Sequence, residues 1–164
     1  MTGGPKWGKV GIRGKRDPRA PMFFGEHEHT VDEKKRLTMP ARFRDELAAG
    51  VVLARGIEKN IDVYPRTSWD ATMARIADLD SLSREAREMK RFVFAGATVA
   101  ELDKQGRVMV PPALSEHAGL GREVVVAGLR DHVEIWDRAR WREQLKEVEG
   151  SVELVAERIA AKQD

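Results

Sequence analysis

Hydrophobic and polar positions follow the same order twice along the chain. Alternating apolar and polar residues predict short strands, and apolar residues spaced three or four apart predict helices. Each copy contains a stretch that reads Asp, three residues, Arg, three residues and Pro: Asp32 to Pro40, and Asp103 to Pro111. The two stretches lie 71 residues apart. The chain is therefore an internal duplication, with too few copies for a solenoid.

Each copy is expected to contain a strand, the Asp-to-Arg turn, a second strand, a short helix, a hairpin and a longer helix. The first copy supplies the clearest boundaries: strands at 23–31 and 37–39, a helix at 41–48 that ends at Gly50, and a hairpin of residues 51–54 and 61–64. A capping-box-like start at Thr67 predicts the longer helix. Two further helices are expected, from Ser83 to about residue 92 and over residues 152–160.

This order of elements predicts an α+β fold, a tandem duplicated β-rich barrel with flanking helices. The expected segments are a basic extension (1–21), a first repeat (22–77), a connecting helix (78–93), a second repeat (94–148) and a helical tail (149–164). The extension carries six basic residues and one acidic residue, a net charge of +5. With so few apolar residues it is expected to be disordered, or to precede the true start of translation at Met22.

Composition narrows the possible functions. Charged residues make up 34% of the 164 residues, which suits a charged partner, although the net charge is only +2. There is no cysteine, so disulfides and thiolate chemistry are excluded. No apolar run is long enough to span a membrane. No nucleophile elbow or phosphate-binding glycine loop is present, so neither an enzyme nor a cofactor is expected.

Three histidines, His27, His29 and His132, are candidate metal ligands by residue type. His27 and His29 lie two apart on one strand face, but the second copy has Thr98 and Ala100 there, and strand histidines are the favoured interpretation. His132 aligns with an asparagine at the start of a strand, so a role in the turn is favoured over a site.

The Asp-x-x-x-Arg turn allows two roles for its arginine. The Asp can accept backbone N–H groups, and the Arg can either pair with it as a structural brace or bind an external phosphate. Local charge favours phosphate: residues 32–44 carry five basic and two acidic side chains, against two and one in residues 103–115. The candidate DNA-binding residues are Lys34, Lys35, Arg36, Arg42, Lys104 and Arg107. The residues expected to structure the motif are Asp32, Asp103, Pro40 and Pro111; Arg44 can be turned away by its helix.

The stretch from Met22 to Arg44, followed by residues 94–111 and by Glu134-Ile-Trp-Asp137, resembles the MraZ transcriptional regulators of the wider SpoVT–AbrB group. The resemblance implies a swapped-hairpin, double-psi-like barrel and a ring-like homo-oligomer. It also implies a repressor of its own division and cell wall gene cluster, which binds short direct repeats in double-stranded DNA. The expected location is the cytoplasm, at the nucleoid. The family commonly has Gly before the first motif arginine, where this chain has Lys35.

Two other functions stay open. The oligomer could be a scaffold for protein partners, in which the Asp–Arg turns are only braces. The wider group also contains antitoxins, for which a neighbouring toxin gene would be expected.

Overall fold

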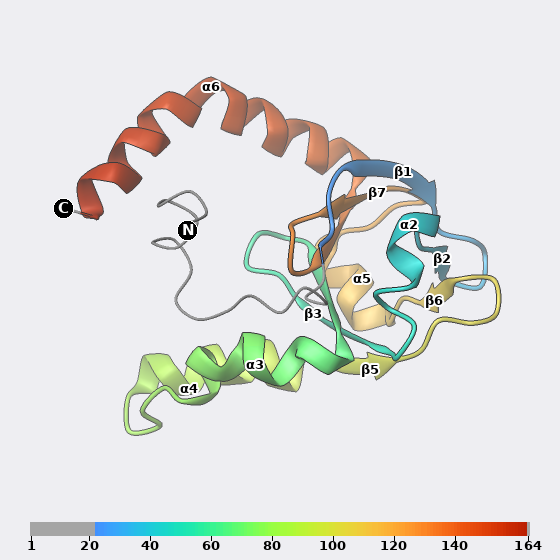
Figure 1. Cartoon of the computed structure of the whole chain (residues 1–164), viewed down its shortest axis with the longest axis horizontal. Helices are drawn as coiled ribbons and strands as arrows, with labels where there is room; N and C mark the ends of the chain where they lie inside the picture. Colours follow the sequence, from blue (N-terminus) through green and yellow to red (C-terminus); the bar gives the residue numbers. More distant parts are fainter. Residues whose placement is uncertain (1–21, 164) are drawn as a thin grey trace, which may run out of the picture.

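The computed structural model of the protein describes residues 22–163, which form a six-stranded sheet, a two-stranded ribbon and surrounding helices (Figure 1). The expected disorder of residues 1–21 lies outside this range. The antiparallel sheet has the order β1-β7-β8-β4-β3-β5, and β2 pairs with β6. The strands are β1 Glu26–Thr30, β2 Arg36–Thr38, β3 Val51–Arg55, β4 Ile61–Pro65, β5 Thr98–Ala100, β6 Arg107–Met109, β7 Glu123–Gly128 and β8 Val133–Asp137.

The two copies exchange strands. β1 of the first copy pairs with β7 of the second, and β5 of the second pairs with β3 of the first. At the centre, β4 pairs with β8 so that Asp62 lies opposite Glu134, its counterpart in the duplication. In the ribbon, Leu37 lies opposite its own counterpart, Val108. Both pairs mark one pseudo-twofold axis, which confirms the expected tandem swapped-hairpin barrel.

One hydrophobic core joins the copies. Leu37, Val108 and the inward side chains of β3, β4, β7 and β8 are buried together, as are Phe43 and Leu114 from the short helices. Alternation in β4 and β8 places the apolar residues inside and Asp62 and Glu134 outside, whereas β3 and β7 are apolar and buried on both faces. Neither copy encloses this core alone, because the exchanged strands close it.

The helices cover the outside of the barrel and connect the copies. They are α2 Ala41–Arg44, α3 Arg66–Ala77, α4 Arg84–Lys90, a π-helix η1 Arg91–Ala95, α5 Pro112–Ala118 and α6 Arg138–Lys162. Tyr64, Met73 and Val93 bury a second apolar cluster between α3, η1 and the sheet. No helix among residues 22–163 has the length and apolar character needed to cross a membrane.

Four predicted helices differ from the structure. The helix expected over 41–48 stops at Arg44, because Leu47 and Gly50 continue the chain in tight turns with i to i+3 hydrogen bonds. α3 has no capping box: Pro65 is its N-cap, and the Ser68 hydroxyl donates to the Pro65 carbonyl.

The other two differences concern helix ends. The helix expected from Ser83 to residue 92 gives way to a π-helix at Arg91, which places Val93 in the second cluster. The separate helix expected over 152–160 is instead the end of α6, which passes through Gly150 without a break.

Candidate nucleic-acid interface

The first Asp-x-x-x-Arg motif forms a tightly hydrogen-bonded turn between β1 and β2. Asp32 Oδ1 accepts the backbone N–H groups of Lys34 (2.9 Å) and Arg36 (2.8 Å). Asp32 Oδ2 accepts from Arg36 Nε at 2.8 Å. The structural brace considered from the sequence is therefore present. Because the brace uses only Nε of Arg36, the two terminal nitrogens of the guanidinium can still donate to an external ligand.

The second motif repeats this geometry between β5 and β6. Asp103 Oδ1 accepts the backbone N–H groups of Gln105 and Arg107, both at 2.9 Å, and its Oδ2 accepts from Arg107 Nε at 2.7 Å. The Arg36 and Arg107 side chains are also equally accessible, at 28% and 27%. The two turns thus have nearly the same geometry, and each holds one arginine at the surface.

These hydrogen bonds hold both aspartates ionised. The backbone N–H of Arg36 is the main cause of the lowered pKa of Asp32, and the N–H of Arg107 does the same for the pKa of Asp103. Each arginine side chain adds to the effect. The braces therefore stay charged at neutral pH.

Lys35, at the position where the resemblance predicts glycine, keeps the turn. Its φ of 63° is left-handed, as is the φ of 78° at its counterpart Gly106. Its carbonyl accepts from Val110 N at 2.8 Å, and the Gly106 carbonyl accepts from Met39 N at 2.9 Å. The turn geometry therefore carries over despite the side chain, at the cost of a strained backbone.

A second difference between the copies explains why Gly106 in the second copy could not be replaced by a larger residue such as Lys35. Arg44 lies against Gly106 and donates from Nε to the Met39 carbonyl at 3.0 Å, so a Cβ on Gly106 would lie 2.4 Å from that nitrogen. The counterpart of Arg44 is the smaller Ser115. Beside Lys35 and Ser115 there is instead a cavity of about 280 Å³. Arg44 is thus a structural residue, consistent with the expectation that its helix turns it away.

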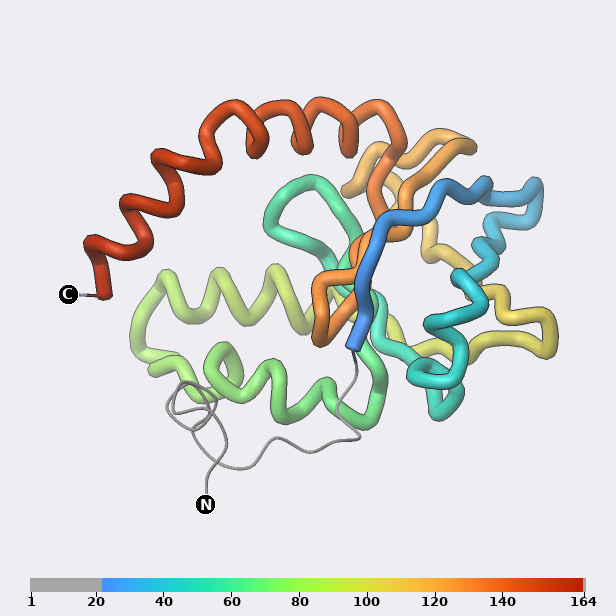
Figure 2. The backbone as a smooth tube through the Cα atoms, turned by 45° about the horizontal axis from the view of Figure 1, so that its top comes forward, coloured from blue at the N-terminus to red at the C-terminus, as the bar shows by residue number. Residues whose placement is uncertain are grey.

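The β2–β6 ribbon brings the two motif arginines together. Leu37 and Val108 point into the core, so their neighbours Arg36 and Arg107 lie on the outer face, diagonally across the pseudo-twofold axis. Both turns lie at the end of the molecule opposite the α3–α4 hairpin and the end of α6 (Figures 1 and 2). The remaining candidates are exposed: Lys34, Lys35 and Lys104 in the turns and Arg42 in α2.

The residues expected to structure the motif occupy matching positions. Pro40 and Pro111 are the N-caps of α2 and α5, each two residues after the end of a ribbon strand. His27, considered as a metal ligand, packs edge-on against the Phe43 ring at 5.2 Å. Among residues 22–163, neither His27 nor His29 belongs to a group of three or more metal-ligating side chains.

The amino-acid sequence also matches a known protein family. The family model described as "MraZ protein, putative antitoxin-like" matches twice, at residues 22–92 and 93–162. The chain belongs to the MraZ family. It is 42% identical over 139 residues to the transcriptional regulator MraZ of Roseiflexus castenholzii, which covers 85% of this chain and 97% of that protein. The transcriptional regulator MraZ of Moorella thermoacetica is 44% identical over 138 residues, covering 84% and 96%.

Sequence reasoning missed one cluster outside the MraZ motif turns. His132, interpreted as a turn residue, lies between Asp62 and Glu134 on the two central strands. The sequence contains part of the information needed to predict this cluster, because Asp62 and Glu134 are counterparts in the duplication. Their direct pairing depends on the register between copies, which the periodicity of one strand does not specify.

Proposed function

We propose that this MraZ-family protein is a sequence-specific DNA-binding transcriptional regulator whose two motif turns contact the DNA backbone and base edges. The proposed contacts are Lys34, Lys35, Arg36, Arg42, Lys104 and Arg107. The observation that carries the proposal is the shared outer face of the β2–β6 ribbon, where both braced arginines are presented across one pseudo-twofold axis. The curated relatives named as transcriptional regulators support the same function.

The braces suit this role. An arginine held by its Nε has lost much of its rotamer freedom before DNA arrives, so less entropy is lost when its terminal nitrogens bind phosphate or guanine. Lysines in the same turns add electrostatic attraction, which is strongest in the first copy. The structural and DNA-binding roles of the arginines, which were alternatives in the sequence, are therefore compatible.

We further propose that the protein works as a ring-like homo-oligomer on short direct repeats. A few phosphate contacts per subunit give weak, salt-sensitive binding, and linking several subunits on repeated sites raises the overall affinity. α6 offers a surface for such assembly: none of its 25 residues is buried, and its apolar residues recur at spacings of four and three. These residues are 42–54% exposed: Val148, Val152, Val155 and Ile159.

The most specific part of the proposal concerns the target. The direct repeats would lie upstream of the protein's own operon, and binding would repress a cluster of division and cell wall genes. The protein would then be found in the cytoplasm, associated with the nucleoid. The resemblance in the sequence supports this target, and the DNA experiment below tests it.

Fluorescence anisotropy of the full chain with DNA from upstream of its own gene, and with scrambled DNA, tests the DNA-binding proposal. We expect tight binding to the upstream DNA alone. Lys34→Ala and Arg42→Ala should each weaken it and flatten the slope of log K against log salt by about one. Arg75→Ala, on α3 at the far end of the molecule, removes the same charge and should change neither.

Two outcomes would contradict this function. Equal, weak and salt-sensitive binding to both DNAs would leave only generic charge, and the scaffold function would replace the regulator. Unchanged binding in both Lys34→Ala and Arg42→Ala would place the interface elsewhere. Lysine and Arg42 variants are preferred to Arg36→Ala here, because Arg36→Ala also removes the brace to Asp32.

The oligomer is tested separately by light scattering coupled to size exclusion. Val152→Asp places a charge within the apolar stripe of α6 and should reduce the oligomer to smaller species. Ala161→Asp, which lies nearly half a turn away around the helix, is the matched control and should leave the mass unchanged. A wild-type chain that elutes as a monomer would refute the ring.

A further inference from the structure

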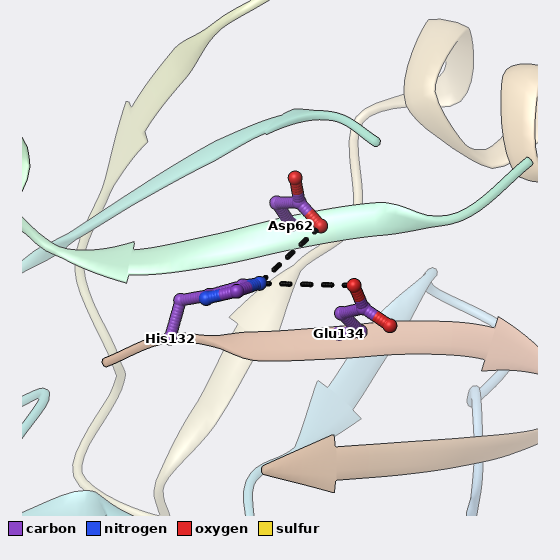
Figure 3. Close-up of side chains that lie close together, drawn as sticks. All are labelled: Asp62, His132 and Glu134. Carbon is purple, nitrogen blue, oxygen red and sulfur yellow. Dashed lines mark ion pairs between the residues drawn. The ribbon is translucent and has the colours of Figure 1, made fainter. Parts of the chain in front are cut away.

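Three metal-ligating side chains converge on the outer face of the central sheet (Figure 3). His132 Nε2 lies 3.9 Å from Asp62 Oδ1 and 3.7 Å from Glu134 Oε2. One potential ligand atom from each residue lies within 4.8 Å of the other two. Each side chain is about one-fifth exposed, so the cluster is sheltered but open to a small ion.

The duplication itself creates this cluster. Asp62 on β4 and Glu134 on β8 are counterparts that pair directly across the pseudo-twofold axis. Strand alternation puts both carboxylates outside, while their neighbours Ile61 and Ile135 are fully buried in the core. Two like charges directly opposite each other on neighbouring strands repel. The central pair of the sheet therefore favours a cation between its carboxylates.

Each potential ligand is also held by a second residue. His132 Nδ1 lies 2.6 Å from Asp131 Oδ1, which suits donation of the Nδ1 proton and leaves Nε2 directed at the carboxylates. Asn60 Nδ2 donates to Asp62 Oδ1 at 2.7 Å. Trp136 Nε1 donates to Glu134 Oε1 at 2.8 Å, so that Oε2 faces His132. A carboxylate behind the histidine and donors behind the carboxylates are the usual outer shell of a metal site.

We propose that Asp62, His132 and Glu134 bind a divalent transition-metal ion of the Zn²⁺ type, which ties the two copies together at their pseudo-twofold axis. Ligands about 2.1 Å from a tetrahedral Zn²⁺ lie about 3.4 Å apart. The two distances from His132 need only a small contraction to reach this value, and the two carboxylates, whose ligand atoms lie within 4.8 Å of each other, can close around the ion. Three protein ligands leave a fourth position for water. The imidazole nitrogen favours Zn²⁺ over Mg²⁺ or Ca²⁺, which prefer oxygen ligands.

In the ion-free cluster, a proton on His132 takes the place of the cation. Burial lowers the pKa of His132, but the Glu134 carboxylate 3.7 Å away, the hydrogen bond to Asp131 and the charge of Asp62 outweigh it and raise the pKa to about 9. Burial also raises the pKa of Asp62 to about 6. A divalent ion would displace the imidazole proton and supply more charge to the same two carboxylates. This proposal is independent of the DNA-binding function.

Isothermal titration of the untagged full chain with Zn²⁺ tests the proposal, with Co²⁺ absorption as a second readout of the ligand set. We expect one ion per chain, no competition from Mg²⁺ and a higher melting temperature with Zn²⁺ bound. His132→Asn should abolish binding. It should also fold, because the counterpart position already holds Asn60. Asp131→Asn should weaken binding about 10- to 100-fold, as loss of an outer-shell partner does.

His29→Asn is the matched control, since it removes one histidine from a strand outside the cluster and should leave Zn²⁺ binding unchanged. Glu134→Gln provides a second ligand variant, similar in shape, and should also abolish binding. Wild-type protein without saturable Zn²⁺ binding would overturn the proposal, as would His132→Asn or Glu134→Gln protein that binds as the wild type does. Binding lost in His29→Asn instead would place the ion on β1 and equally overturn it.

Discussion

A Cβ at Gly106 should destabilise the protein far more than a change at its counterpart, Lys35. Both residues have left-handed backbones, with φ of 78° and 63°. In Gly106→Ala the new Cβ would lie 2.4 Å from Arg44 Nε and 2.6 Å from Arg44 Cδ, closer than real contacts allow. Arg44 must then move and give up its hydrogen bond to the Met39 carbonyl, which the structure shows at 3.0 Å.

The magnitude follows from these two losses. A non-glycine residue in the left-handed region costs about 1–2 kcal/mol, and a lost hydrogen bond costs about 0.5–1.5 kcal/mol. Gly106→Ala should therefore lower the free energy of unfolding by about 1.5–3.5 kcal/mol. Lys35→Gly relieves the strain at its own position but makes the unfolded chain more flexible, so its effect should lie between zero and about 1 kcal/mol of stabilisation.

Urea unfolding of both variants measures these differences, and a double-mutant cycle isolates the contact. Arg44→Ser copies Ser115 of the second copy and removes the side chain that the Cβ would meet. In that background Gly106→Ala should cost only the backbone strain, about 1–2 kcal/mol. A Gly106→Ala cost that is the same with and without Arg44 would refute the steric argument, and a Lys35→Gly variant as unstable as Gly106→Ala would refute the asymmetry.

Three further predictions concern stability, each measured by the midpoint of urea unfolding. The folded-state pKa of Asp32 lies below its unfolded value near 3.9, so its turn stabilises the protein fully above that pH and loses the effect as pH falls through the folded value; Asp32→Asn should show less weakening on acidification than the wild type. Leu37→Ala should cost about 2–5 kcal/mol because the side chain is fully buried at the centre of the ribbon; a cost under about 1 kcal/mol would contradict that placement. Gly56→Ala places a Cβ 2.0 Å from the buried Asn60 Oδ1 and should cost about 1–3 kcal/mol, whereas an unchanged midpoint would mean that Asn60 moves freely.

Periodicity predicted the elements of this fold better than their ends. The apolar run at residues 51–54 and the alternation at residues 61–64 located the hairpin that became β3 and β4. The ends depended on tertiary packing: η1 widens the helix where Val93 reaches the second cluster, and α6 continues through Gly150 because the residue is tolerated within an otherwise helical run. Local sequence carries little information about either event.

The candidate interface shows the same division between local and long-range information. Asp32 and Arg36 lie four apart, so the sequence alone could propose their brace, and the structure contains it. The meaning of Lys35 could not be read from its own motif. It depends on Ser115 and on the contrasting contact between Arg44 and Gly106, which join residues more than sixty positions apart.

Strand exchange also predicts how one copy behaves alone. Residues 22–97 contain β1 to β4 but lack every strand from the second copy that β1, β2, β3 and β4 pair with across the duplication. Because the second copy's strands are counterparts of the first copy's own, another molecule of this fragment can supply the same pairings, with Leu37 opposite Leu37 and Asp62 opposite Asp62. We therefore expect sedimentation to show an unfolded chain at low concentration and a folded homodimer at high concentration. A stable folded monomer would show that one copy closes its own core, and would contradict the exchanged pairing as the source of stability.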